Sequence, residues 1–97
     1  MAIIVTMEFP GFGQELYDTV IDRLTDSGEF ASVIEVPAPG LMAHVAGPVD
    51  DGWRWIEVWK NKEALEMFLE VLKPILADLE YPEREPSIAP AYKVVLD

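Results

Sequence analysis

His44 is the only histidine in the chain, and three residues that follow it could complete a chemical site around it. An unperturbed imidazole ionises near neutral pH, so His44 is suited to act as a general base. Trp55, Glu57 and Trp59 occur at alternate positions, which lie on one face of a β-strand. Together these residue types would form a pocket with one base, one carboxylate and aromatic walls, suited to a flat apolar molecule.

Whether His44 reaches the other three depends on the pairing of two segments. Residues 41–46, LMAHVA, and 53–59, WRWIEVW, are predicted strands of a hairpin, with GPVDDG at 47–52 as the turn. If the turn pairs Ala46 with Trp53, His44 lies opposite Trp55 and on the same face as the carboxylate. A slip of one residue would move His44 to the other face.

Each of these residues also has a structural explanation. A partly buried histidine can bind a backbone carbonyl, and strand tryptophans can fill the core of a dimer. Tyr17 and Tyr92 could donate hydroxyl hydrogen bonds at the rim of a pocket, or could be structural. Arg54 could hold a carboxylate or pair with an acidic neighbour, and the pair is the simpler hypothesis. The predicted site is therefore His44 as the catalytic residue, with substrate-binding residues Trp55, Glu57, Trp59, Tyr17 and Tyr92.

The elements that must position these residues can be read from periodicity. Residues 2–9 are β-branched and aromatic and predict a strand, and 14–27 follow a helical stripe. Residues 29–40 are a short strand or an apolar loop. Asn61 is a predicted N-cap for a helix that runs to about residue 79, with a kink or break near 70–74 at Pro74. Residues 82–87 are a predicted loop, and 88–96 a last strand.

The resulting order βαββαβ predicts a single ferredoxin-like α+β domain over 1–97, an antiparallel sheet with two helices on one face. Another α+β topology remains the alternative. Both faces of the 53–59 strand are apolar, although a sheet covered on one side by helices should have one face in water. The second face therefore needs a cover, and we expect a second copy of the chain.

Composition excludes several classes of protein. The net charge is −11, with 18 acidic and 7 basic residues, so nucleic acid and anionic membranes are not expected partners. The chain lacks cysteine, which favours a cytoplasmic protein. One histidine without cysteine excludes the common zinc sites, and no phosphate-binding glycine motif occurs. We expect no metal and no cofactor.

Residues 57–68, EVWKNKEALEMF, resemble the strand-to-helix corner of the dimeric α/β-barrel superfamily, and most closely antibiotic biosynthesis monooxygenase-like domains. HVAGP at 44–48, followed by GWR at 52–54, is similar to a subgroup of small bacterial proteins of that superfamily. The specific part of the resemblance covers residues 41–68. Its haem-degrading branch has an Asn on the first strand and a His on the second helix, and this chain has neither.

The resemblance implies a homodimer whose two sheets face each other, with a pocket aromatic at Trp59. It also implies a cofactor-independent monooxygenase, or a cyclase or isomerase, that acts on an aromatic or polyketide-like molecule. Such an enzyme needs no metal or flavin, because an electron-rich anionic substrate can react with oxygen itself. The alternatives are a protein that binds an apolar small molecule without converting it, and a structural dimer whose aromatic face is only core.

Overall fold

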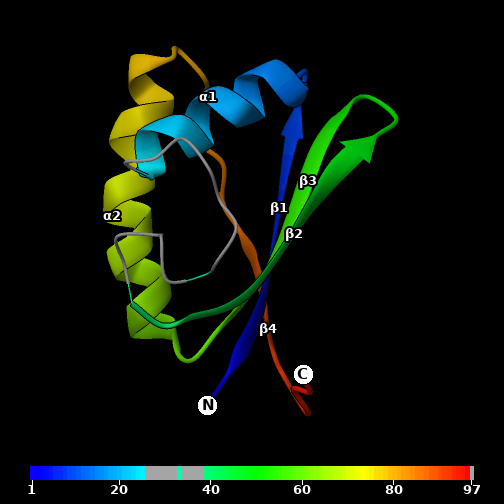
Figure 1. Ribbon diagram of the computed structural model, residues 1–97, viewed down its shortest axis with the longest axis vertical. Coiled ribbons are helices and arrows are strands. Elements are labelled where there is room, and N and C mark those ends of the chain that lie inside the picture. Colours follow the sequence, from blue (N-terminus) through cyan, green and yellow to red (C-terminus); the bar gives the residue numbers. More distant parts are fainter. Residues whose placement is uncertain (26–32, 34–38, 97) are drawn as a thin grey trace.

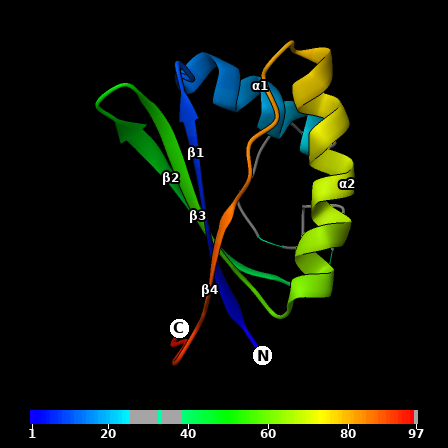
Figure 2. The ribbon, with the colours of Figure 1, turned by 180° about the vertical axis from the view of Figure 1, so that it is seen from behind.

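The structure is a computed structural model that describes residues 1–25, 33 and 39–96. Four strands form one antiparallel sheet in the order β2-β3-β1-β4, and two helices cover one face of it (Figures 1 and 2). The predicted ferredoxin-like α+β fold is confirmed. The elements are β1 (Ile3–Pro10), α1 (Gln14–Leu24), β2 (Leu41–Val49), β3 (Gly52–Trp59), α2 (Lys62–Asp78) and β4 (Ser87–Pro90).

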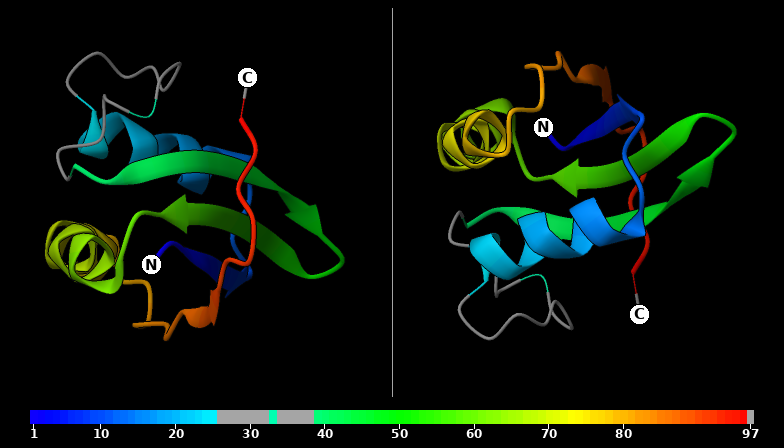
Figure 3. Two further views of the ribbon diagram at one scale, coloured as in Figure 1. Left: turned by 90° about the horizontal axis from the view of Figure 1, so that it is seen from below. Right: turned by 90° about the horizontal axis from the view of Figure 1, so that it is seen from above.

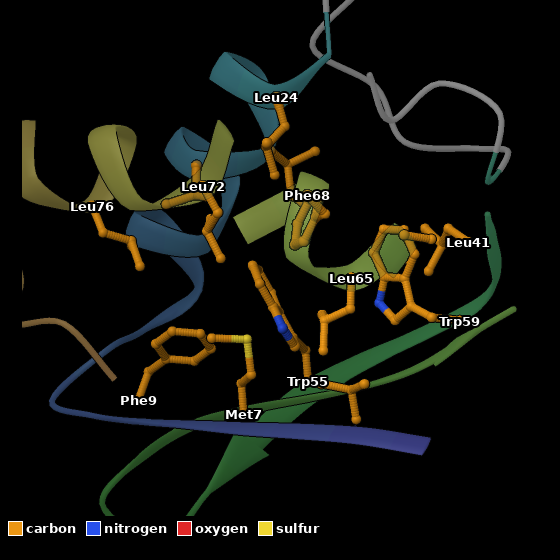
Figure 4. Close-up of a cluster of buried hydrophobic side chains, with 14 of the residues drawn as sticks. Met7, Phe9, Leu24, Leu41, Trp55, Trp59, Leu65, Phe68, Leu72 and Leu76 are labelled. Atoms are coloured by element: carbon orange, nitrogen blue, oxygen red, sulfur yellow. The ribbon is translucent and has the colours of Figure 1, made fainter. Parts of the chain in front are cut away.

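Strand β1 lies in the middle of the sheet and separates the two faces by alternation. Its odd-numbered residues are buried beneath the helices, whereas Ile4 and Glu8 point to the other face and are exposed. Its buried side chains meet apolar residues of α2 and β3, and Figure 4 shows Leu72 and Leu76 of α2 directed toward Met7 and Phe9. The core therefore lies between the sheet and the helices of one chain.

Helix α2 begins where the sequence predicts and continues past Pro74. The side chain of Asn61 accepts a hydrogen bond from the Ala64 backbone N–H at 2.8 Å, which caps the first turn. Pro74 lies inside the helix, which does not break there and ends at Asp78. Apolar residues of α2 are buried on both sides of the proline, and this packing offsets the missing backbone hydrogen bond.

Three other predicted boundaries were wrong or lie outside the described residues. Helix α1 ends at Leu24, before residue 27, because Thr25 is extended and both its N–H and its hydroxyl bind the Ile21 carbonyl. Strand β4 stops at Pro90, before residue 96, and one further backbone hydrogen bond, from the Ala91 N–H to the Ala2 carbonyl, follows it. Residues 29–40 lie mostly outside the described part of the chain.

The face of the sheet away from the helices carries apolar side chains in contact with solvent. Val45 is 64% exposed and Ile56, its partner across the β2–β3 ladder, is 36% exposed. Ile4 on β1 is exposed on the same face, whereas Ile88 on β4 pairs with the buried Val5 and so belongs to the helix-covered side. Arg54 lies on this face and binds Glu8 at 3.0 Å, so it pairs with an acidic neighbour as the simpler hypothesis held. In Figure 3, α2 is seen nearly end-on, and the β2–β3 hairpin reaches away from it.

Candidate functional site

The β2–β3 hairpin has a tighter turn than the sequence suggested. Strand β2 continues to Val49, which pairs with Gly52, so only two residues form the turn. Pro48 can belong to β2 because β2 is an edge strand, where a missing N–H leaves no ladder hydrogen bond unmade on the outer side. A side chain at Gly52 would meet the Phe9 carbonyl oxygen at 2.3 Å, so only glycine fits where β3 passes β1.

The tighter turn changes which residue His44 faces. His44 lies opposite Glu57, and Trp55 pairs with Ala46, so the predicted pairing of Ala46 with Trp53 was wrong by two residues. A shift of two positions preserves the face of a strand, whereas a shift of one would reverse it. His44 therefore does share a face with the carboxylate and the tryptophans.

Four side chains from three elements form one line of hydrogen bonds. Tyr17 of α1 places its Oη 2.7 Å from His44 Nε2 on β2. His44 Nδ1 lies 2.8 Å from Glu57 Oε2 on β3. The other carboxylate oxygen, Glu57 Oε1, accepts a hydrogen bond from Trp59 Nε1 at 3.0 Å. We call these four residues the relay chain: Tyr17, His44, Glu57 and Trp59.

The direction of these bonds follows from the groups involved. An indole N–H only donates, so Trp59 fixes one end of the relay chain, and an ionised Glu57 only accepts. With Glu57 ionised, His44 Nδ1 carries a proton, and Nε2 of the neutral ring accepts the Tyr17 hydroxyl. If His44 takes a second proton, the Tyr17 oxygen becomes the acceptor. The relay chain can thus accept one added proton while its hydrogen bonds remain in place.

Burial divides the relay chain into a closed end and an open end. Glu57 is 2% exposed and Trp59 is fully buried, whereas Tyr17 is half-buried. Burial, and after it the charges of Glu57 and Asp18, raise the pKa of Tyr17 from 10.0 to about 12. The phenol therefore stays protonated at neutral pH, and its side chain is the most exposed of the four in the relay chain.

The other tryptophans flank this open end. Trp55 packs edge-on against His44, with ring centres 5.4 Å apart, and Trp53 lies 5.2 Å from the Tyr17 ring. Among the described residues, neither indole N–H has an acceptor, although both are buried. A buried donor without a partner is costly, so each of these N–H groups would gain from an acceptor.

The structure differs from two expectations about aromatic residues: that the strand tryptophans fill a dimer core, and that Tyr92 lies at the site. Trp55 and Trp59 are buried beneath the helices of their own chain, and Trp59 packs on Phe68 of α2, so they do not fill a dimer core. Tyr92, predicted to bind substrate, follows β4 with a fully exposed side chain and is not brought to the relay chain.

Sequence reasoning did not find a mainly apolar pocket beside the second helix. A cavity of about 160 Å³ lies under the C-terminal half of α2, lined among others by Met7, Leu72, Lys73 and Arg84. Neither His44 nor Trp59 lines it. The signal in the sequence was the presence of two cations, Lys73 and Arg84, on either side of the end of an apolar helix in an acidic chain.

Residues 1–25, 33 and 39–96 contain no group of three or more His, Asp or Glu side chains that could hold a metal ion. No helix in those residues is both long and apolar enough to cross a bilayer.

The comparisons with known proteins give the fold and nothing narrower. No family model matches the chain, and no curated protein matches it in sequence. Two crystal structures of SnoaB, a cofactor-independent oxygenase from Streptomyces nogalater, are similar over 99% of this chain and 97% of theirs, each with a TM-score of 0.59. Sequence identity is 18% for one and 17% for the other, a mutant of the same enzyme. At this identity the likeness shows a shared fold.

Proposed function

We propose that the chain is a cytoplasmic, homodimeric, cofactor-independent oxygenase that acts on an electron-rich aromatic, polyketide-like molecule. The observation that carries this is the relay chain, in which a buried His44–Glu57 pair ends on the half-buried phenol of Tyr17. The shared fold with SnoaB, itself a cofactor-independent oxygenase, supports the same class of reaction.

The first step is removal of a proton from the substrate. The substrate binds at the open end, against Tyr17 and the tryptophans that flank it. Its acidic C–H or O–H proton passes to the Tyr17 oxygen while the phenol proton passes to His44 Nε2, 2.7 Å away. The Glu57 carboxylate stabilises the imidazolium that forms, and the substrate is left as an anion. The high pKa of Tyr17 fits a group that carries a proton and does not lose it.

The second step is oxidation of that anion by dioxygen. A carbanion or phenolate can give electrons to oxygen directly, so the substrate is its own reductant. If the reacting carbon is a CH₂ group, one oxygen atom becomes its new carbonyl and the other leaves as water with both hydrogens. Atoms and electrons then balance without a cofactor.

Oxygen uptake with a panel of phenols and anthrones tests the proposal. We expect turnover by the wild type and a loss of about 10²–10⁴-fold in His44→Ala, the usual contribution of a general base. Arg54→Gln is the matched control, since Arg54 lies on the opposite face of the sheet and should leave the rate unchanged. Equal turnover by wild type and His44→Ala would remove the relay chain from the mechanism. A panel that leaves oxygen unconsumed would favour a binding protein.

The homodimer rests on the open face of the sheet. Ile4, Val45 and Ile56 expose apolar surface there on neighbouring strands, and the two helices lie on the other side. A second copy that places its own sheet against this face would bury both sets of side chains. The relay chain is complete within one protomer, so the dimer adds stability without supplying the base.

A further inference from the structure

The cavity under α2 is separate from the relay chain and has a different chemical character. Its floor is Met7 of β1, and its apolar wall includes Leu72 and Leu76 of α2. Tyr81 closes it beside the segment that leads from α2 to β4, which Figure 2 shows descending beside β1. The cavity is of the size that accepts one aromatic ring, because an apolar cavity of about 150 Å³ binds benzene.

Charged side chains stand at one side of this apolar cavity. Lys73 and Glu83 both line it and bind each other at 3.0 Å, so their charges cancel. Arg84 also lines it, and no carboxylate of the described residues forms an ion pair with its guanidinium. Glu70 and Glu85 also lie close enough to act on the charge of Lys73. Arg84 is therefore the cation of the cavity lining that is left without a carboxylate partner among the described residues.

A partition separates the cavity from His44. Met7 pairs with Trp55 across the β1–β3 ladder, and Figure 4 shows the two side chains next to each other in the core. Trp55 in turn packs against His44. A ligand in the cavity would thus lie on the far side of Trp55 from the relay chain, and its binding does not depend on oxygenase activity.

We propose that this cavity is a second ligand site, which binds a small aromatic monocarboxylate. The ring enters among the leucines and Met7, and the carboxylate pairs with the Arg84 guanidinium, which can bind both oxygens at once. Because Lys73 is held by Glu83, Arg84 is the lining cation that remains to bind a carboxylate. A neutral ring without the carboxylate would fill the same space with lower affinity.

Titration of the full chain with 3-phenylpropanoate and with its neutral amide tests both parts of the proposal. We expect the carboxylate to bind with a Kd on the order of a millimolar or tighter, and to shift the methyl NMR signals of Leu72 and Leu76. Arg84→Gln should weaken the carboxylate about ten-fold and leave the amide unchanged. Lys93→Gln removes a charge near the end of the chain and is the control that should change neither.

A second variant tests the location without touching the core. Ala77 lines the cavity but is exposed on α2, so Ala77→Trp should fill the entrance and abolish binding of both probes while the protein stays folded. The proposal is overturned if the wild type binds neither probe, if Arg84→Gln binds the carboxylate as before, or if Ala77→Trp still binds. His44→Ala should bind normally, which separates this site from the oxygenase proposal.

Discussion

Tyr17 and His44 are 27 residues apart in the sequence, yet Tyr17 Oη lies 2.7 Å from His44 Nε2. This bond joins α1 to β2 and makes a half-buried phenol the outer end of a buried pair. Because the phenol of Tyr17 lies outside the His44–Glu57 pair, a proton would reach His44 through the Tyr17 hydroxyl. Tyr17 is therefore a structural contact between two elements and, in the proposed function, the group that a substrate meets first.

The raised pKa of Tyr17 predicts a loss of stability at high pH. Below pH 10.0 the phenol is protonated in both the folded and the unfolded chain, so it adds no pH dependence. Between 10.0 and about 12 the unfolded chain loses the proton and the folded chain keeps it, so the free energy of unfolding falls as pH rises. Denaturant titrations across this range should show a steeper fall for the wild type than for Tyr17→Phe. Equal slopes would contradict the assignment.

Glu57→Ala should be among the most destabilising single changes in the chain. It removes the acceptor of the Trp59 N–H and the partner of His44 Nδ1 from a site that is 2% exposed. Breaking a buried pair in this way costs about 3–5 kcal/mol in the free energy of unfolding, measured by denaturant titration.

Glu57→Gln is the matched control for that change. The amide keeps the shape, can still accept from Trp59 and can donate to His44 Nδ1, so it should cost much less than the alanine. It should also lower the pKa of Tyr17 toward 10.0, because the Glu57 charge is the second cause of the shift after burial. Equal destabilisation by both variants would show that the carboxylate's hydrogen bonds add little.

The sequence predicted the face of the site better than its pairing. Alternation along β3 places Trp55, Glu57 and Trp59 together whatever the turn does, and any even shift of β2 keeps His44 with them. The actual turn could not be predicted, because Gly47 and Pro48 are typical turn residues. They belong to β2 because an edge strand tolerates proline and because β3 must cross β1 at Gly52.

The contact between Tyr17 and His44 was beyond sequence reasoning for a different reason. The helical stripe of α1 predicts that Tyr17 faces the sheet, but which strand it meets depends on how the helix lies across the sheet. The side chains of Leu24, Val20 and Ile21 set that position through burial in the common core. The cavity under α2 is also a property of packing, since it is the space that the side chains of three segments leave unfilled.

Asn61→Ala should weaken the start of α2 by about 1 kcal/mol, because the Ala64 N–H loses its side-chain acceptor. Asn61→Asp is the control, since a carboxylate can accept the same bond and favours a helix N-terminus. Thermal or denaturant unfolding of the three proteins checks this. A variant Asn61→Ala as stable as the wild type would mean that water replaces the cap.

The open face of the sheet predicts where a dimer can be broken. Ile56→Asp puts a charge among the exposed apolar side chains of β3, next to Val45, and should shift the protein to monomer in analytical ultracentrifugation. Met67→Asp is the matched control, because Met67 is 58% exposed on α2 and lies away from the sheet. It should leave the sedimentation coefficient unchanged.

Since the relay chain is made within one protomer, monomeric Ile56→Asp should keep the Tyr17–His44 bond. The high-pH titration of Tyr17 should therefore be the same as in the wild type. A monomeric wild type, or a dimer that only Met67→Asp disrupts, would show that the sheet is not the interface.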